Sequence, residues 1–167
     1  MSKPVPKLAS NRSPYWAFMQ KFEVPDYDHP ERNYLTRWRL IQTPWFGIYV
    51  HKLEGPDPRA TLHDHPWSFV SFILKGGYHE HRLNPVTREV EERDVGFCNI
   101  MRRDDAHFIE YLHRGPTWSL LFVGKRRRTW GYLEPFIDGD PSWCWTAFNE
   151  HHYDEAFQNA LAQRKAQ

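Results

Sequence analysis

The chain has 167 residues, a formal net charge of +1 and 40% apolar residues. This length favours a single domain. The near-zero charge disfavours anionic lipid and nucleic acid as partners, although nucleic acid stays open. No apolar run reaches the roughly 20 residues of a membrane span. The two cysteines and the polar, proline-bearing start lead us to expect a cytoplasmic protein with reduced thiols.

Aromatic residues and turn residues alternate along the chain. Eight Trp, eight Tyr and 11 Phe are interrupted by 13 Pro and nine Gly. Aromatic and β-branched residues favour strands, and many short runs between turns are typical of an all-β sandwich or barrel. The strands predicted in this way are residues 34–42, 46–53, 61–74 with a bend near Pro66, 78–83, 88–92, 96–101, 107–112, 117–123 and 127–133.

The two ends of the chain differ from this central series. Residues 1–34 are expected to form an N-terminal arm, whose second half covers one edge of the domain, and residues 35–147 the β-barrel domain. Residues 148–167 contain good helix formers and predict a C-terminal helix, with Asn149 as its N-cap. Apolar side chains at every fourth position would give this helix one stripe that packs on the domain.

The most informative residues are three histidines. His63 and His65 stand two residues apart at the head of an apolar, strand-like run, and His107 follows much later in the chain. Side chains on a strand alternate between its two faces, so the first two imidazoles are expected on the same side. Two close imidazoles and a third supplied by the fold can build a metal site with open positions.

These residues resemble the two motifs of the cupin superfamily, whose fold is a double-stranded β-helix, or jelly roll, with a metal in the mouth of the barrel. In the first motif a His-x-His pair is followed by a glutamate and then a glycine, and His63, His65 and Gly76 keep that spacing. In the second motif a histidine lies eleven positions after a glycine, as His107 does after Gly96. The resemblance implies that the three histidines hold one divalent metal ion.

The sequence also departs from the cupin pattern, which it otherwise follows from residue 45 to 133. Phe69 stands where the family has its glutamate ligand, Arg102 and Asp104 replace the Pro and Gly of the second motif, and Tyr111 replaces its Asn. A three-histidine set without glutamate occurs in the thiol dioxygenases among cupins, which use ferrous iron. The resemblance therefore implies iron(II), with zinc, nickel or manganese as alternatives.

Three further residues are candidates for catalytic roles near the metal, namely Tyr78, Glu80 and Arg102. Glu80 alternates onto the same face as Tyr78 and away from His79 and His81, whose own His-x-His sequence we interpret as a solvated strand face. If Glu80 faces the barrel, it is a fourth ligand, a carboxylate that orients a histidine, or a general base. The alternative is a charged surface residue.

A basic run, Lys125 to Arg128, leads into the last predicted strand, 127–133. We interpret it as a solvated face, with two alternatives: a guanidinium clamp for a carboxylate or phosphate, or, together with the aromatic residues that follow, a contact for single-stranded nucleic acid. Asp64 alternates away from the ligand face and is expected to cap a turn or to form an ion pair.

The sequence thus predicts a metal-dependent cupin enzyme, most favourably an iron(II) oxygenase that acts on a small anionic or chelating substrate. A zinc-dependent hydrolase or isomerase stays open, because three histidines also suit zinc-bound hydroxide. A non-catalytic metal- or metabolite-binding cupin stays open too, because Phe69 beside Trp67 would fill part of the pocket. A small molecule is the expected partner, a membrane is not, and the resemblance allows a homodimer.

Overall fold

The computed structural model describes residues 16–26, 29, 31–58, 60–135 and 143–147, and every regular element among them is a β-strand. The all-β prediction is therefore confirmed for this part of the chain. The expected C-terminal helix, residues 148–167, lies outside the described residues. No helix in the described part is long and apolar enough to cross a membrane.

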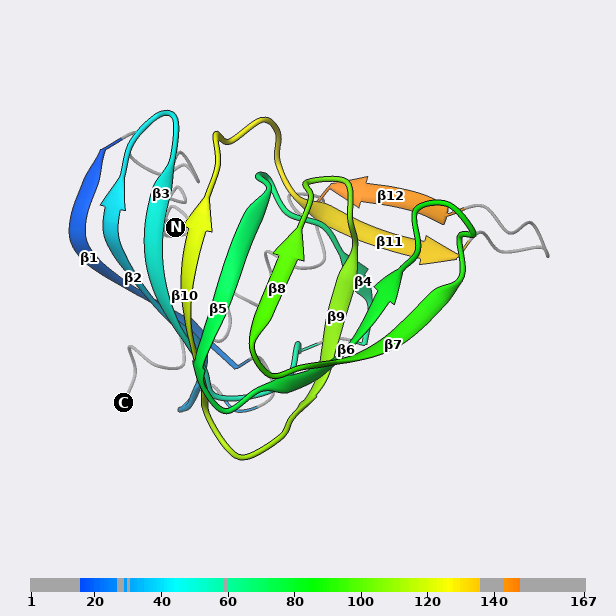
Figure 1. Ribbon diagram of the computed structural model, residues 1–167, viewed down its shortest axis with the longest axis horizontal. Coiled ribbons are helices and arrows are strands. Elements are labelled where there is room, and N and C mark those ends of the chain that lie inside the picture. Colours follow the sequence, from blue (N-terminus) through cyan, green and yellow to red (C-terminus); the bar gives the residue numbers. More distant parts are fainter. Residues whose placement is uncertain (1–15, 27–28, 30, 59, 136–142, 148–167) are drawn as a thin grey trace, which may run out of the picture.

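The strands form two six-stranded antiparallel sheets (Figure 1). The first sheet has, in spatial order, β1 (Ala17–Pro25), β2 (Asn33–Gln42), β3 (Gly47–Leu53), β10 (Thr117–Val123), β5 (Phe69–Lys75) and β8 (Cys98–Met101). The second has β12 (Trp143–Ala147), β11 (Gly131–Pro135), β4 (Leu62–His63), β9 (His107–Leu112), β6 (Tyr78–Leu83) and β7 (Val90–Val95). Strands distant in sequence are therefore neighbours in each sheet.

Most predicted strands are present, and β6, β9 and β10 begin and end where they were predicted. The predicted strand 61–74 is two strands in different sheets, β4 and β5, because the chain turns after His65 at Pro66, which has no backbone N–H to offer a neighbouring strand. The predicted strand 127–133 begins only at Gly131, and β12 was not predicted.

Residues 17–25, which fall in the range expected to be an N-terminal arm, form the strand β1. This strand pairs along the length of β2 and forms one edge of the first sheet, as Figure 1 shows at the left. This part of the chain is thus an edge strand of the sheet itself.

The glycine pair carries the chain from the first sheet to the second. Gly76 and Gly77 have φ angles of 87° and 134°, which only glycine adopts at low cost. A Cβ atom on Gly76 would lie 2.6 Å from the Thr117 hydroxyl, and that hydroxyl accepts a hydrogen bond from the Gly77 N–H and donates one to its carbonyl. This tight connection places β6, with Tyr78 and Glu80, directly after β5.

Buried apolar side chains of the described residues hold the two sheets together. One cluster joins Leu35 and Leu53 of the first sheet to Tyr78, Val95 and Ile109 of the second. Burial of each large apolar side chain contributes roughly 1.5–3 kcal/mol to stability. The apolar contacts therefore close one part of the interior, next to the polar residues described below.

Candidate metal centre

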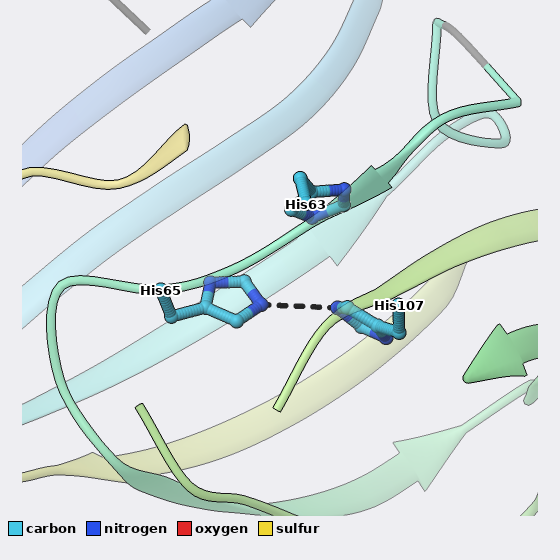
Figure 2. Close-up of side chains that lie close together, drawn as sticks. All are labelled: His63, His65 and His107. Carbon is cyan, nitrogen blue, oxygen red and sulfur yellow. Dashed lines mark hydrogen bonds between the residues drawn. The ribbon is translucent and has the colours of Figure 1, made fainter. Parts of the chain in front are cut away.

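The three predicted ligands meet in the interior, and we call them the inner histidine group: His63, His65 and His107 (Figure 2). His63 on β4 and His107 on β9 are direct cross-strand partners, while His65 reaches the group from the loop after β4. Each residue offers one ring nitrogen, and these nitrogens all lie within 4.8 Å of one another. The convergence is as predicted, although only His63 of the first pair lies on a strand.

The spacing of the ring nitrogens fits one divalent ion. The Nε2 atoms of His65 and His107 are 3.0 Å apart, and a metal with nitrogen ligands at about 2.0–2.1 Å sets neighbouring ligand atoms about 3 Å apart. Burial lowers the pKa of His63 and of His65, and the neighbouring charge of His107 lowers the pKa of His65 further. Both rings are therefore neutral near pH 7 and offer the lone pair that a metal requires.

A buried carboxylate, Glu80, orients the ring of His107 by binding the nitrogen that faces away from the other two histidines. The ring nitrogen Nδ1 of His107 donates to Glu80 Oε2 at 2.6 Å, which directs its Nε2 toward the other two histidines. Glu80 is fully buried, and its second oxygen Oε1 has no hydrogen-bond partner among the described residues. Burial alone would raise the pKa of Glu80, but the hydrogen bond and charge of His107 and the charge of Arg82 hold it below its usual range. The carboxylate is therefore ionised.

A chain of hydrogen bonds supports Glu80. Asn99 donates from Nδ2 to Glu80 Oε2 and to the Tyr78 hydroxyl, both at 2.9 Å, and accepts from Arg82 at 3.2 Å. Arg82 is itself ion-paired with Asp105. Burial and the charge of Glu80 raise the pKa of Tyr78 well above its ordinary value, so the phenol keeps its proton. Glu80 thus contacts the His107 nitrogen that faces away from His63 and His65, and Tyr78 is connected to Glu80 through Asn99.

His63 has a different carboxylate neighbour, which sequence reasoning did not identify. Asp57 Oδ2 lies 3.8 Å from His63 Nδ1 and accepts the backbone N–H of Ile109 at 2.6 Å, while its Oδ1 accepts the hydroxyl of Tyr34. In the sequence, Asp57 stands between Pro56 and Pro58, outside the predicted strands 46–53 and 61–74.

Asp64, between the first two histidines, points away from them as predicted. It is 2% exposed, accepts the Gly131 N–H at 2.8 Å and the Trp145 indole N–H at 2.6 Å, and pairs with the Arg128 guanidinium at 2.8 Å. The prediction of an ion pair is confirmed. Asp64 therefore connects β11 and β12 to the end of β4, and Arg128, the last residue of the basic run, pairs with its charge. Residues 125–127 are exposed, as expected for a solvated face.

Of two other residues singled out from the sequence, Phe69 contacts the inner histidine group and Arg102 lines a depression elsewhere. The ring of Phe69 meets the His65 ring edge-on at 5.0 Å between centroids, so an apolar contact replaces the glutamate ligand of the family pattern. Arg102 is exposed and lines a depression with Arg82 and Arg93, and no histidine of the inner group is among the lining residues. Arg102 is thus not brought to the histidines.

A polar pair that the sequence analysis missed faces the interior from the first sheet. Arg37 on β2 and His51 on β3 are cross-strand partners, and each lies two residues along its strand from the core pair of Leu35 and Leu53. Arg37 Nε donates to His51 Nε2 at 2.7 Å, and the charge of Arg37 contributes to the low pKa of His65. Strand alternation from Leu35 would have identified this inward position.

A second set lies on the outer face of the second sheet, and we call it the outer histidine group: His79, His81 and Glu110. His81 Nε2 lies 2.9 Å from Glu110, and His79 Nδ1 lies 2.9 Å from Asp94. The two imidazoles stack on Phe108 and Tyr111 of β9. As predicted, these histidines alternate away from the fully buried Glu80.

Comparison with known proteins gives structural neighbours only. No family model matches the chain, and no curated protein matches it. An RmlC-like cupin from Shewanella frigidimarina NCIMB 400 is 11% identical over 68% of this chain and 96% of its own, with a TM-score of 0.47. The polyketide cyclase RemF from Streptomyces resistomycificus is 19% identical over 84% and 90%, with a TM-score of 0.44.

A third solved structure, the hydroxypropylphosphonic acid epoxidase from S. wedmorenis, is 14% identical over 63% of this chain and 55% of its own, with a TM-score of 0.43. These proteins are what the chain is similar to in fold. The two antiparallel sheets and the three-histidine group of the chain itself agree with the resemblance to cupins that its sequence motifs carry.

Proposed function

We propose that this protein is a metal-dependent enzyme whose single divalent ion is held by His63, His65 and His107. The observation that carries the proposal is the 2.6 Å hydrogen bond from His107 Nδ1 to the buried Glu80, together with the 3.0 Å approach of the His65 and His107 Nε2 atoms. Metal-binding histidines are characteristically held by such a carboxylate on the nitrogen that does not face the metal.

The proposed ion is iron(II), and the proposed reaction is the oxidation of a small anionic or chelating substrate by dioxygen. Three imidazoles are neutral ligands, so a bound ion keeps its full charge and attracts an anionic donor. When bound, iron(II) would supply the redox chemistry with dioxygen at the positions that the histidines leave open. The preference for iron rests on the resemblance to three-histidine cupins.

The chain's own residues would hold and shape this site. Glu80 fixes the ring of His107, and Tyr78, which keeps its proton, holds Asn99 in line with Glu80. We therefore propose both as positioning residues, because neither faces the open side of the inner histidine group. Phe69 covers one edge of the His65 ring and keeps water from that side.

A zinc-dependent hydrolase or isomerase is the second candidate, and the same hydrogen bond favours it. A carboxylate behind a histidine is the arrangement found at zinc sites, where it raises the basicity of the ligand. Zinc held by three histidines lowers the pKa of its bound water to about 7. The two candidates share the same ligands and differ in the ion.

Elemental mass spectrometry of protein purified without added metal tests the proposal. We expect near-stoichiometric iron in the wild type and its loss in a His63→Ala/His107→Ala double variant. The matched control is His79→Ala/His81→Ala, which removes the same number of histidines from the outer group and should keep the iron. Oxygen uptake with small acids and thiols would then identify the reaction.

Two results would change the conclusion. Zinc that is lost from the inner double variant and kept by the outer one would favour the hydrolase or isomerase. A wild type without metal, and still without it after iron(II), zinc, nickel and manganese are offered, would contradict a metal-dependent enzyme and favour a protein that binds a metabolite without turnover.

A further inference from the structure

We propose that Arg37, held in the interior by His51 and Tyr49, binds the carboxylate of a small organic acid. The inference deepens the proposed function and rests on it in one respect: it takes that acid to be the substrate, whose other end reaches the metal at the inner histidine group. The binding of a carboxylate by Arg37 can be measured with or without the metal.

Arg37 is held rigidly before any ligand arrives. Its Nε donates to His51 Nε2 at 2.7 Å, and its guanidinium lies over the Tyr49 ring at 5.6 Å from the centroid. Burial lowers the pKa of His51 well below its ordinary value, so the ring is neutral and accepts this bond. A guanidinium held in this way loses little conformational freedom when it binds an anion.

The free edge of the guanidinium matches an oxyanion. With Nε engaged by His51, the N–H groups of the two terminal nitrogens make no hydrogen bond within the described chain, and these nitrogens are not among its buried unpartnered atoms. They therefore reach solvent-accessible space. Two parallel N–H groups form the fork that binds a carboxylate in a bidentate manner.

Among the described residues, no carboxylate forms an ion pair with Arg37. Arginines such as Arg82 and Arg128, by contrast, each pair with a carboxylate. A half-buried cation without a nearby counter-charge attracts an anion. Burial lowers the pKa of Arg37 to about 10, which leaves it charged at neutral pH.

The next residue on this face, Arg39, adds to the positive potential. Arg39 is the cross-strand partner of Tyr49, and its charge is the second cause, after burial, of the lowered pKa of Arg37. Its Nε is buried without a partner among the described residues. Two neighbouring cations on one inner face favour an anion more than either does alone.

The position of Arg37 connects this anion site to the inner histidine group. Tyr49, beneath the guanidinium, meets Trp67 edge-on at 6.0 Å between ring centroids, and Trp67 follows His65 by two residues. A small acid bound at Arg37 would thus have its remaining atoms directed along the interior toward the histidines.

Binding of succinate, malonate and acetate to the zinc-loaded and the metal-free protein tests the inference. Titration calorimetry in chloride at constant ionic strength would compare the wild type with Arg37→Met, Arg37→Lys and the exposed control Arg32→Met. A titration with inorganic phosphate distinguishes a carboxylate site from a phosphate site. Metal content is measured on each sample.

We expect at least one carboxylate to bind the wild type and the Arg32→Met control equally, and Arg37→Met at least about tenfold more weakly. Arg37→Lys should fall between them, because it keeps the charge and loses the fork. It also serves as the test variant if Arg37→Met does not fold. Without ligand, Arg37→Met should melt at the same temperature as the wild type or higher, which a structural ion pair would not allow.

Equal carboxylate affinity in the wild type and Arg37→Met would overturn the inference, as would a wild type that binds none of the carboxylates or only phosphate. The outcome is separable from that of the proposed function. Metal bound by the histidines with no role for Arg37 would leave the proposed function standing. If the protein takes up no metal and Arg37→Met loses carboxylate binding, the role of Arg37 would stand and the proposed function would fail.

Discussion

The inner and outer histidine groups begin from the same His-x-His sequence and end in opposite environments. In the inner group the ring nitrogens converge on one another, and carboxylates lie only behind the rings, as Glu80 does at His107. In the outer group each ring contacts a carboxylate directly, as His81 does with Glu110 and His79 with Asp94. The same His-x-His spacing therefore contributes to two different donor sets: three imidazoles inside, and two imidazoles with a carboxylate outside.

The environments also shift the pKa values in opposite directions. Burial lowers the pKa of His63 and His65, whereas the hydrogen bond from Asp94 raises that of His79. Desolvation disfavours the imidazolium, and a neighbouring carboxylate favours it. His63 and His65 therefore favour the neutral ring that offers a lone pair, while His79 favours the protonated ring.

The largest effect that separates the two groups should come from removing one histidine of each. We expect His107→Ala to weaken the binding of zinc, used as a redox-inert probe, by more than about 100-fold, because one of three ligands and its carboxylate support are lost together. His81→Ala should leave the affinity unchanged. Competition with a chromophoric chelator measures both, and an equal loss in the two variants would remove the distinction.

The next effect concerns the carboxylate behind the ring. Glu80→Gln should weaken zinc binding by about 10–100-fold, because a neutral amide holds the His107 tautomer less strongly. Glu110→Gln, which alters the carboxylate in direct contact with His81, serves as the matched change on the outer face and should have no effect. An unchanged affinity in Glu80→Gln would show that Glu80 does not position His107 for a metal.

The stability of the metal-free protein should fall as the pH is lowered below about 6.5, the ordinary histidine pKa. The folded state holds His51, His63 and His65 with lowered pKa values, so the unfolded chain binds more protons in the interval between the folded values and 6.5. Each such proton reduces the unfolding free energy by about 1.4 kcal/mol per pH unit. Urea unfolding after chelation, at pH 5 to 8, measures the slope, and a flat profile would contradict it.

The smallest effect should come from the outer group, with the opposite sign. The raised pKa of His79 means that its pair with Asp94 is fully present below the ordinary histidine pKa and is lost as the pH rises through the folded value. Melting temperatures of the wild type and Asp94→Asn should therefore differ slightly at pH 5.5 and coincide at pH 8.5. A difference that grows with pH would be inconsistent with this pair.

Some features of this protein follow from local sequence rules. The alternation of side chains on strands places Glu80 opposite His79 and His81, and turn residues mark the limits of β6, β9 and β10. The spacing of His63 and His65 and their resemblance to a family motif indicate the ligand set. Each of these depends on a few neighbouring residues or on a motif, so the sequence alone is sufficient.

Other features exist only because distant segments pair. The break at Pro66 sends β4 and β5 into different sheets, which the apolar run alone does not reveal. The register of β2 with β3 puts Arg37 beside His51 in the interior, and the pairing of β4 with β9 brings His107 to His63. The sequence by itself determined which residue types were available and which of them share a face of a strand. Only the tertiary structure decided which of them became neighbours, because contacts between strands depend on sheet order and register and not on local spacing.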